Sequence, residues 1–253
     1  AVVHCLSFSF KEWNSLKFHY FYKIMVPLVL ITSKHIFTVS KYTLEEIIEH
    51  YSRIKNLSTK MSVVYNGYFN KNINSKNDKN NYVLYVGTIS KRKNIKILID
   101  AMNEINKYDT VIKLKIVGES NNRIFENDKI GNTAWIEFLG HINDTTKLAN
   151  LYSNAKLFVF PSLYESFGIP PIEAQSFGCP VVCSNATSLP EICGEGALYF
   201  NPHDVNDLKS KIELVLGDEN LQNELRNKGF ENVKRFSWEE SAKKIIEIIE
   251  RIY

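Results

Sequence analysis

Residues 158–182 read FVFPSLYESFGIPPIEAQSFGCPVV, and their order indicates how the chain folds. Its apolar start predicts a buried strand that ends at Pro161. A loop carrying Glu165 follows, and the proline pair at 170–171 is suited to open a helix, because proline fits the first helical turn. The apolar run 180–184 then predicts another strand. Strand, helix and strand in this order are typical of a parallel sheet.

The same alternation extends along most of the chain. Further strands are predicted at 82–86, 111–117, 135–139 and 156–160, and helical segments at 95–105, 148–152 and 172–177. Repeated units of this size predict an α/β fold with a doubly wound parallel sheet, whose ligands gather at the carboxyl ends of the strands. From Asp204 onward the pattern is wholly helical, and the last helix follows a capping box of Ser237 and Glu240.

An Asn- and Lys-rich connector divides the chain. Its residues, FNKNINSKNDKNN, offer almost nothing that could be buried. Before it, strands are predicted at 35–40 and 61–65, around a helix that Thr43 and Glu46 could open as a capping box. The predicted domains are the end of a first domain at 1–68, a linker at 69–81, a ligand-binding domain at 82–235 and a closing helix at 236–253.

The composition indicates a globular chain without a nucleic-acid partner. Of 253 residues, 44% are hydrophobic, enough for one large core or two smaller ones. The 31 basic and 28 acidic residues are scattered and leave a net charge of +3, too little for a broad positive field. The Asp, Glu and His residues show no metal-ligand spacing and no Asp-x-Asp pair. We therefore expect neither a metal nor another cofactor.

Cysteine usage and the chain's start bear on location. Cys5, Cys179, Cys183 and Cys193 form no CxxC pair, which favours buried reduced thiols and a cytoplasmic protein. No apolar stretch approaches the roughly 20 residues of a membrane-spanning helix. The chain starts without Met and shows no secretory leader, so we interpret it as a fragment.

The helix predicted after Gly168 offers an anion site. Its free N–H groups and positive dipole end suit a phosphate, and Gly168 lets a ligand approach the backbone closely. Glu173 lies about one turn inside the helix, so Glu165 and Glu173 could face one pocket. The alternative is a surface Glu and a second Glu that only stabilises the helix dipole.

The complete string resembles a known family. Glu165-Ser-Phe-Gly168, Glu173-Ala174 and the following GCPVV match the donor-site pattern of retaining GT-B glycosyltransferases in the large mannosyl- and glucosyltransferase group, glycosyltransferase family 4 or "group 1". The resemblance implies that Glu165 contacts the transferred sugar and that Glu173 binds the ribose hydroxyls of the nucleotide. It further implies that the donor is held by the loop residues Ser166, Phe167, Gly168 and Ile169.

A second loop, residues 86–94, carries cations after a strand. The string VGTISKRKN is similar to the V-G-x-x-x-x-R-K-N string of the same family. The resemblance implies that Gly87 belongs to the donor site and that Arg92 and Lys93 stabilise the leaving diphosphate. Many members have an Arg where this chain has Thr88. The alternative is a pair of solvated surface cations.

Two features before the connector have two interpretations each. His4 resembles the family's His near the transferred sugar, although Cys5 replaces the usual Asp; a structural His is the alternative. Residues 11–34 interleave aromatic residues with lysines. That segment either packs as a core helix or rests on a membrane surface beneath a lipid-linked acceptor.

The resemblance implies a GT-B glycosyltransferase with two Rossmann-like domains, of which about ninety N-terminal residues are missing here. We expect a metal-independent hexosyltransferase (EC 2.4.1.-) in polysaccharide biosynthesis that transfers mannose or glucose from a nucleotide sugar to a saccharide or lipid-linked acceptor, with retained configuration. It would act in the cytoplasm, at the inner membrane face if the aromatic segment contacts lipid. The alternatives are a nucleotide-sugar-binding module without turnover and a nucleotide-sugar 2-epimerase.

Overall fold

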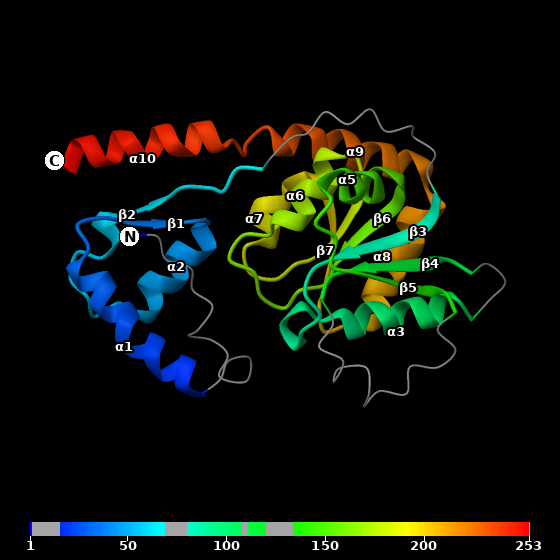
Figure 1. The fold of residues 1–253 in the computed structure, drawn as a ribbon, viewed down its shortest axis with the longest axis horizontal. Coiled ribbons are helices and arrows are strands. Elements are labelled where there is room, and N and C mark those ends of the chain that lie inside the picture. The colour runs from blue at the N-terminus through cyan, green and yellow to red at the C-terminus, as the bar shows by residue number, and fades with distance from the viewer. Residues whose placement is uncertain (2–15, 69–79, 108–110, 120–133, 253) are drawn as a thin grey trace. The chain divides into compact units, whose positions relative to one another are not determined.

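The computed structural model describes residues 1, 16–68, 80–107, 111–119 and 134–252. They divide into two units, each described by itself (Figure 1). Most of the predicted connector lies outside the described residues, but its last two residues begin a strand. Unit 1 comprises Ala1–Tyr68, Glu165–Gly168 and Phe236–Tyr253, and unit 2 comprises Phe69–Tyr164 and Ile169–Arg235.

Unit 2 contains the predicted parallel sheet. Its six strands lie in the order β5-β4-β3-β6-β7-β8, and every neighbouring pair is parallel. The order reverses between β3 and β6, which makes their carboxyl ends a topological switch point. The strands are β3 (Asn80–Val86), β4 (Lys113–Val117), β5 (Ile136–Gly140), β6 (Ala155–Phe160), β7 (Val181–Ser184) and β8 (Ala197–Phe200).

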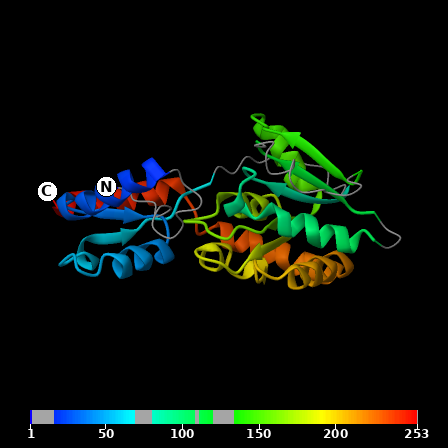
Figure 2. The same cartoon turned by 90° about the horizontal axis from the view of Figure 1, so that it is seen from below.

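Helices cover both faces of this sheet, so the doubly wound prediction is confirmed (Figures 1 and 2). Alternate strand residues point to opposite faces. Val83 and Tyr85 pack with α3 and α8, whereas Tyr82 and Leu84 pack with α5, α6 and α7. The helical elements are η3 (Lys91–Lys93), α3 (Ile95–Ile105), α5 (Thr145–Asn154), α6 (Ile169–Ser176), α7 (Leu189–Cys193), η4 (Gly194–Gly196), α8 (Val205–Gly217) and α9 (Glu219–Val233).

Two parts of unit 2 bear on the sequence predictions. Strand β8 was not predicted, because four residues are too few to show a period, yet it pairs with β7 along its whole length. Cys179, Cys183 and Cys193 are free and buried, which confirms the prediction for these three thiols. Cys5 lies outside the described residues.

Unit 1 has the predicted strand, helix, strand order. Strand β1 (Ile36–Thr38) pairs in parallel with β2 (Met61–Val63), and α2 (Lys41–His50) connects them through η2 (Ser58–Lys60). The predicted capping box at Thr43 is wrong: Ser40 caps α2, because its hydroxyl accepts from the Thr43 N–H at 3.1 Å. The C-terminal helix α10 (Trp238–Ile252) follows Ser237, whose hydroxyl accepts from the Glu240 N–H at 3.4 Å.

Helix α1 (Leu16–Thr32) of unit 1 has two different apolar faces. Val26 and Leu30 are buried in the core of the unit, as the core-packing interpretation expects. Further apolar side chains remain exposed, among them Phe21, Ile24, Leu28 and Ile31. Within the described part of the chain, no helix combines the length and apolar character needed to cross a bilayer.

Candidate functional site

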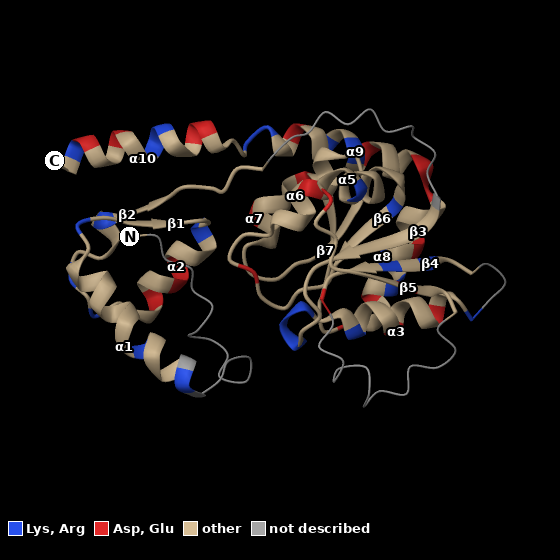
Figure 3. Cartoon of the chain, viewed as in Figure 1, with Lys and Arg blue, Asp and Glu red and all other residues tan. Residues whose placement is uncertain are grey.

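The turn after β3 carries the two predicted cations. Gly87 follows the strand directly, and its N–H donates to the Val117 carbonyl at 2.9 Å. Ser90 caps η3, the basic turn that precedes α3 in Figure 3. Lys93 is only 8% exposed, and its ammonium lies 4.7 Å from the ring centroid of Phe160 at the end of β6. The chain thus places a nearly buried cation at the switch point between β3 and β6.

Arg92 ties the two loops at this switch point together. Its guanidinium donates to the Tyr164 carbonyl at 2.8 Å, and its own carbonyl accepts from the Leu163 N–H at 2.9 Å. One guanidinium nitrogen therefore positions the loop that follows β6. The sequence did not indicate this contact, because the two residues are far apart in the chain.

Gly118 was not singled out in the sequence, yet it packs against the turn that follows β3. It follows β4, and a Cβ at this position would lie 1.9 Å from the Gly87 carbonyl oxygen. Only glycine therefore fits here without moving the turn after β3. The sequence feature that could have indicated Gly118 is its position directly after a predicted strand.

The loop after β6 is also tied to β7. The Ser184 hydroxyl donates to the Ser162 carbonyl at 2.7 Å and accepts from the Ala186 N–H at 3.1 Å. The hydroxyl oxygen of Ser162 is buried and has no hydrogen-bond partner among the described residues. These bonds hold the carboxyl ends of β6 and β7 in register beside the start of α6.

Helix α6 begins at Ile169, so Glu173 lies in its second turn, as predicted. The Tyr152 hydroxyl of α5 donates to Oε2 of Glu173 at 3.0 Å. Burial raises the pKa of Glu173, and the bond from Tyr152 lowers it by a smaller amount. A carboxylate near this helix end can accept hydrogen bonds from ligand hydroxyls.

The residues Glu165, Ser166, Phe167 and Gly168 belong to unit 1. The Ser166 carbonyl accepts from the Thr43 hydroxyl at 3.3 Å, and the Phe167 ring packs edge-on against Phe236. Gly168 has φ +113°, a conformation that favours glycine. Glu165 is 9% exposed. The Ser166 carbonyl and the Phe167 ring therefore both hold this segment to unit 1.

His4, which was also predicted to belong to the site, is outside the described residues.

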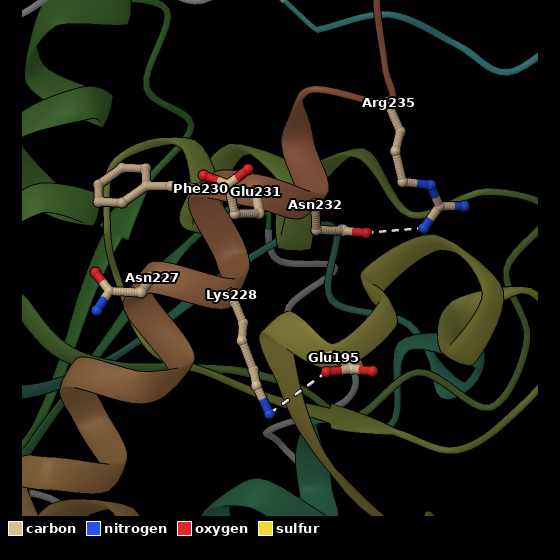
Figure 4. Close-up of a pocket in the computed structure, with 7 residues that line it drawn as sticks. All are labelled: Glu195, Asn227, Lys228, Phe230, Glu231, Asn232 and Arg235. Atoms are coloured by element: carbon tan, nitrogen blue, oxygen red, sulfur yellow. Dashed lines mark hydrogen bonds and ion pairs between the residues drawn. The ribbon is translucent and has the colours of Figure 1, made fainter.

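A cavity of about 680 Å³ lies beside α9 and is drawn in Figure 4; none of the predicted site residues lines it. Two of its cations have neighbours: Lys228 lies 3.4 Å from Glu195, and Arg235 donates a hydrogen bond to the Asn232 side chain at 2.8 Å. Among the described residues, no group of three acidic, His or Cys side chains could hold a metal ion.

A doubly wound parallel sheet with a glycine turn and a buried lysine at its switch point defines a Rossmann-like ligand-binding domain. Residues 68–232 match the family model described as "Glycosyl transferases group 1". The chain belongs to this family.

Similar proteins include glycosyltransferases of known and unknown specificity. The serotype-specific mannosyltransferase WbdA of Escherichia coli is 34% identical over 235 residues, which cover 86% of this chain and 29% of WbdA. The uncharacterized glycosyltransferase MJ1178 of Methanocaldococcus jannaschii is 30% identical over 94% of this chain and 64% of its own length. The chain thus spans less than two thirds of either relative.

Solved structures support the same GT-B fold. The sucrose-phosphate synthase from Thermosynechococcus elongatus superposes with a TM-score of 0.80 at 23% identity, over 99% of this chain and 67% of that one. Anabaena Alr3699/HepE, solved in complex with UDP and glucose, gives a TM-score of 0.78 at 20% identity, over 90% of this chain and 66% of that one. The predicted fold class and family are confirmed.

Proposed function

We propose that this chain is the donor-binding part of a retaining hexosyltransferase that uses a nucleoside-diphosphate sugar. Its acceptor would be a saccharide or lipid-linked saccharide in polysaccharide biosynthesis. The relatives support this proposal, because two of them are named O-antigen chain mannosyltransferases and one is named for capsular polysaccharide biosynthesis. Mannose is accordingly the first sugar to test, and glucose the second.

One observation carries the proposal: the loops after β3 and β6 meet at the switch point of the sheet. In open α/β sheets, ligands bind outside the carboxyl ends of the strands at such a point. Here the Lys93 ammonium lies over Phe160, the last residue of β6. A cation in this place suits a pyrophosphate.

The proposed chemistry assigns each residue a task. Lys93, with Arg92, would stabilise the negative charge that grows on the departing diphosphate. Gly87 and the N-terminal turn of α6, entered through Gly168 and Ile169, would approach the donor with backbone groups. Glu165 and His4 would contact the transferred sugar, and Glu173 would accept hydrogen bonds from the ribose hydroxyls. Backbone N–H groups of the loop residues Ser166 and Phe167 would hold sugar and phosphate oxygens. A phosphate oxygen of the leaving group would accept the acceptor's proton, so no separate general base is required.

Nucleotide binding provides the first test. A thermal-shift panel of GDP, UDP and ADP identifies the base, because a ligand at 100 times its dissociation constant adds about 2.7 kcal/mol. Glu173→Ala should weaken binding of the best ligand by about tenfold or more, since a hydrogen bond to a charged group contributes about 1.5–3 kcal/mol. Equal affinity of the variant and the parent, or no binding to either, would exclude the proposed site.

The alternatives differ in turnover. A binding module retains nucleotide affinity but releases no diphosphate when donor and acceptor are present together. A 2-epimerase converts the donor without any acceptor. Release of diphosphate only with acceptor, together with NMR of the anomeric proton in the product, distinguishes all three and tests retention.

We propose metal-independent transfer, in which Lys93 and helix N–H groups neutralise the diphosphate. Turnover should then persist in excess EDTA and gain nothing from added Mn²⁺.

A cytoplasmic location is also part of the proposal, and the three free, buried cysteines support it. Fractionation of cells that express the tagged chain tests it.

The exposed face of α1 supports peripheral contact with a membrane, which we add to the proposal. Phe21 and Ile24 are 57% and 65% exposed, and Lys17 and Lys23 stand on the same helix. An apolar face with nearby lysines suits an anionic lipid surface. The double change Phe21→Ser and Ile24→Ser should reduce co-sedimentation with phosphatidylglycerol vesicles, whereas pure phosphatidylcholine vesicles should bind both proteins weakly. Equal sedimentation of both proteins would favour packing of this face against protein.

A further inference from the structure

Tyr152 is the buried partner of Glu173. It is fully buried near the C-terminal end of α5, and its ring stacks on Phe177 at 5.9 Å between centroids and meets Phe158 edge-on at 5.5 Å. Two aromatic contacts leave the ring little freedom, so its hydroxyl points in a fixed direction. That hydroxyl donates to Oε2 of Glu173 at 3.0 Å.

The bond from Tyr152 occupies only one of the two carboxylate oxygens of Glu173. A carboxylate has two oxygens, and each accepts more than one hydrogen bond. Within the described parts of the chain, Tyr152 is the side chain that bonds the carboxylate of Glu173, and it occupies Oε2. Oε1 is therefore the oxygen available to a ligand.

We infer that Tyr152 is a positioning residue: it holds Oε2 of Glu173 so that Oε1 faces the ribose hydroxyls of the bound nucleotide. The inference rests on the proposed function of Glu173. A long side chain must lose rotamer freedom to accept a hydrogen bond from a ligand, and a buried donor restricts that freedom before the ligand arrives. Removal of the donor should therefore reduce recognition of the ribose and leave recognition of the diphosphate unchanged.

Tyr152→Phe tests this role, because it removes only the hydroxyl. The probe is whichever of GDP, UDP and ADP binds the parent best, compared by calorimetry with its 2′,3′-dideoxy form. The variant should bind the ribose form about fivefold weaker, because the carboxylate of Glu173 must then lose rotamer freedom when the ligand binds. It should bind the dideoxy form as the parent does. The matched control is Tyr82→Phe, which removes another buried hydroxyl, one that donates to the Leu151 carbonyl at 2.7 Å. This control should retain the discrimination.

Two further measurements separate the possible failures. Glu173→Ala removes both carboxylate oxygens and should abolish the preference for ribose; if the preference persists, the proposed role of Glu173 fails and the inference fails with it. If Glu173→Ala behaves as expected but Tyr152→Phe retains the preference, or loses both ligands equally, only the positioning role is overturned.

The ionisation of Glu173 gives a readout without any ligand. Since the bond from Tyr152 lowers the pKa of Glu173, carbon NMR should detect a higher pKa in Tyr152→Phe. The nearby Cys179 thiol acts on Tyr152 and is present in both proteins, so it does not account for a difference. An unchanged pKa would show that the bond is absent in solution and would overturn the inference.

Discussion

At the scale of single residues, the site depends on glycines whose missing side chains leave room for backbone. Gly118 is the clearest case, since a Cβ there would lie 1.9 Å from the carbonyl oxygen of Gly87. Backbone atoms cannot move aside as the tip of a side chain can. The turn after β3, which carries Lys93, would therefore have to shift.

Gly118→Ala should lower the free energy of unfolding by at least about 2 kcal/mol, because it overpacks two strand ends. It should also weaken nucleotide binding. The matched control is Gly140→Ala: Gly140 also has a positive φ, +64°, but a Cβ there meets nothing within 4 Å. That change should cost only about 1 kcal/mol of left-handed strain and leave binding intact. Urea unfolding of both variants checks the difference; similar losses would contradict the close contact.

At the scale of elements, a buried polar network joins α6, α7 and α9. The Asn232 amide donates to the Gln175 side chain at 2.8 Å and to the Ile192 carbonyl at 2.9 Å. Gln175 in turn donates to the Cys193 carbonyl at 2.9 Å. Since α6 also carries Glu173, the network holds the helix of the proposed site against its neighbours.

Asn232→Ala should destabilise unit 2 by about 2–3 kcal/mol, because it leaves two buried acceptors without their donor. Asn227→Ala on the exposed side of the same helix is the control and should stay within about 0.5 kcal/mol of the parent. Thermal unfolding followed by circular dichroism compares them. If both variants unfold together with the parent, the network contributes nothing to stability.

Elements were predictable from the sequence where their period was long enough to count. The run Ile95–Ile105 is the clearest helix, because apolar residues recur at helical spacing and α3 has these bounds. β8, with four residues, offered no period. Ser40 was missed as a cap because Thr43 and Glu46 match the capping-box pattern and Ser40 has no Glu or Gln three residues on. The extended backbone of Ser40 and its bond from the Thr43 N–H show that the helix begins there.

Of the candidate site, only the residues that lie in recognisable sequence motifs could be predicted. Glu173 and Lys93 stand in strings whose residue order is visible in the chain. Their partners, Tyr152 and Phe160, are set by how strands and helices pack, and no local pattern indicates such contacts. Arg92 shows the limit: its charge indicated a ligand, but no local pattern indicated that its guanidinium also bonds the Tyr164 carbonyl.

At the scale of the whole molecule, the burial of Glu173 should lower the stability of the folded protein, although the same carboxylate serves nucleotide binding. Burial raises its pKa in the folded state above the unfolded value of about 4.3. Between those two pKa values the folded state holds more protons than the unfolded state, so stability falls as pH rises through this window and stays lower above it.

Glu173→Gln lacks this titration. The variant should therefore be more stable than the parent at pH 7.5, with a smaller difference at pH 4, while its nucleotide affinity is reduced. Urea midpoints at the two pH values provide the measurement. A stability difference that does not change with pH would show that the carboxylate is not buried in solution.

The order of strands in the sheet also constrains synthesis. Val83 of β3 pairs with Leu157 of β6, so the first strand of unit 2 leaves the ribosome long before its second neighbour. In that interval β3 has one open edge, which is a site for aggregation and for chaperones. We expect nascent chains arrested after α5 to remain sensitive to protease, and chains extended through α9 to become resistant. We therefore expect chaperones to protect the first half of the sheet until the second half has been translated.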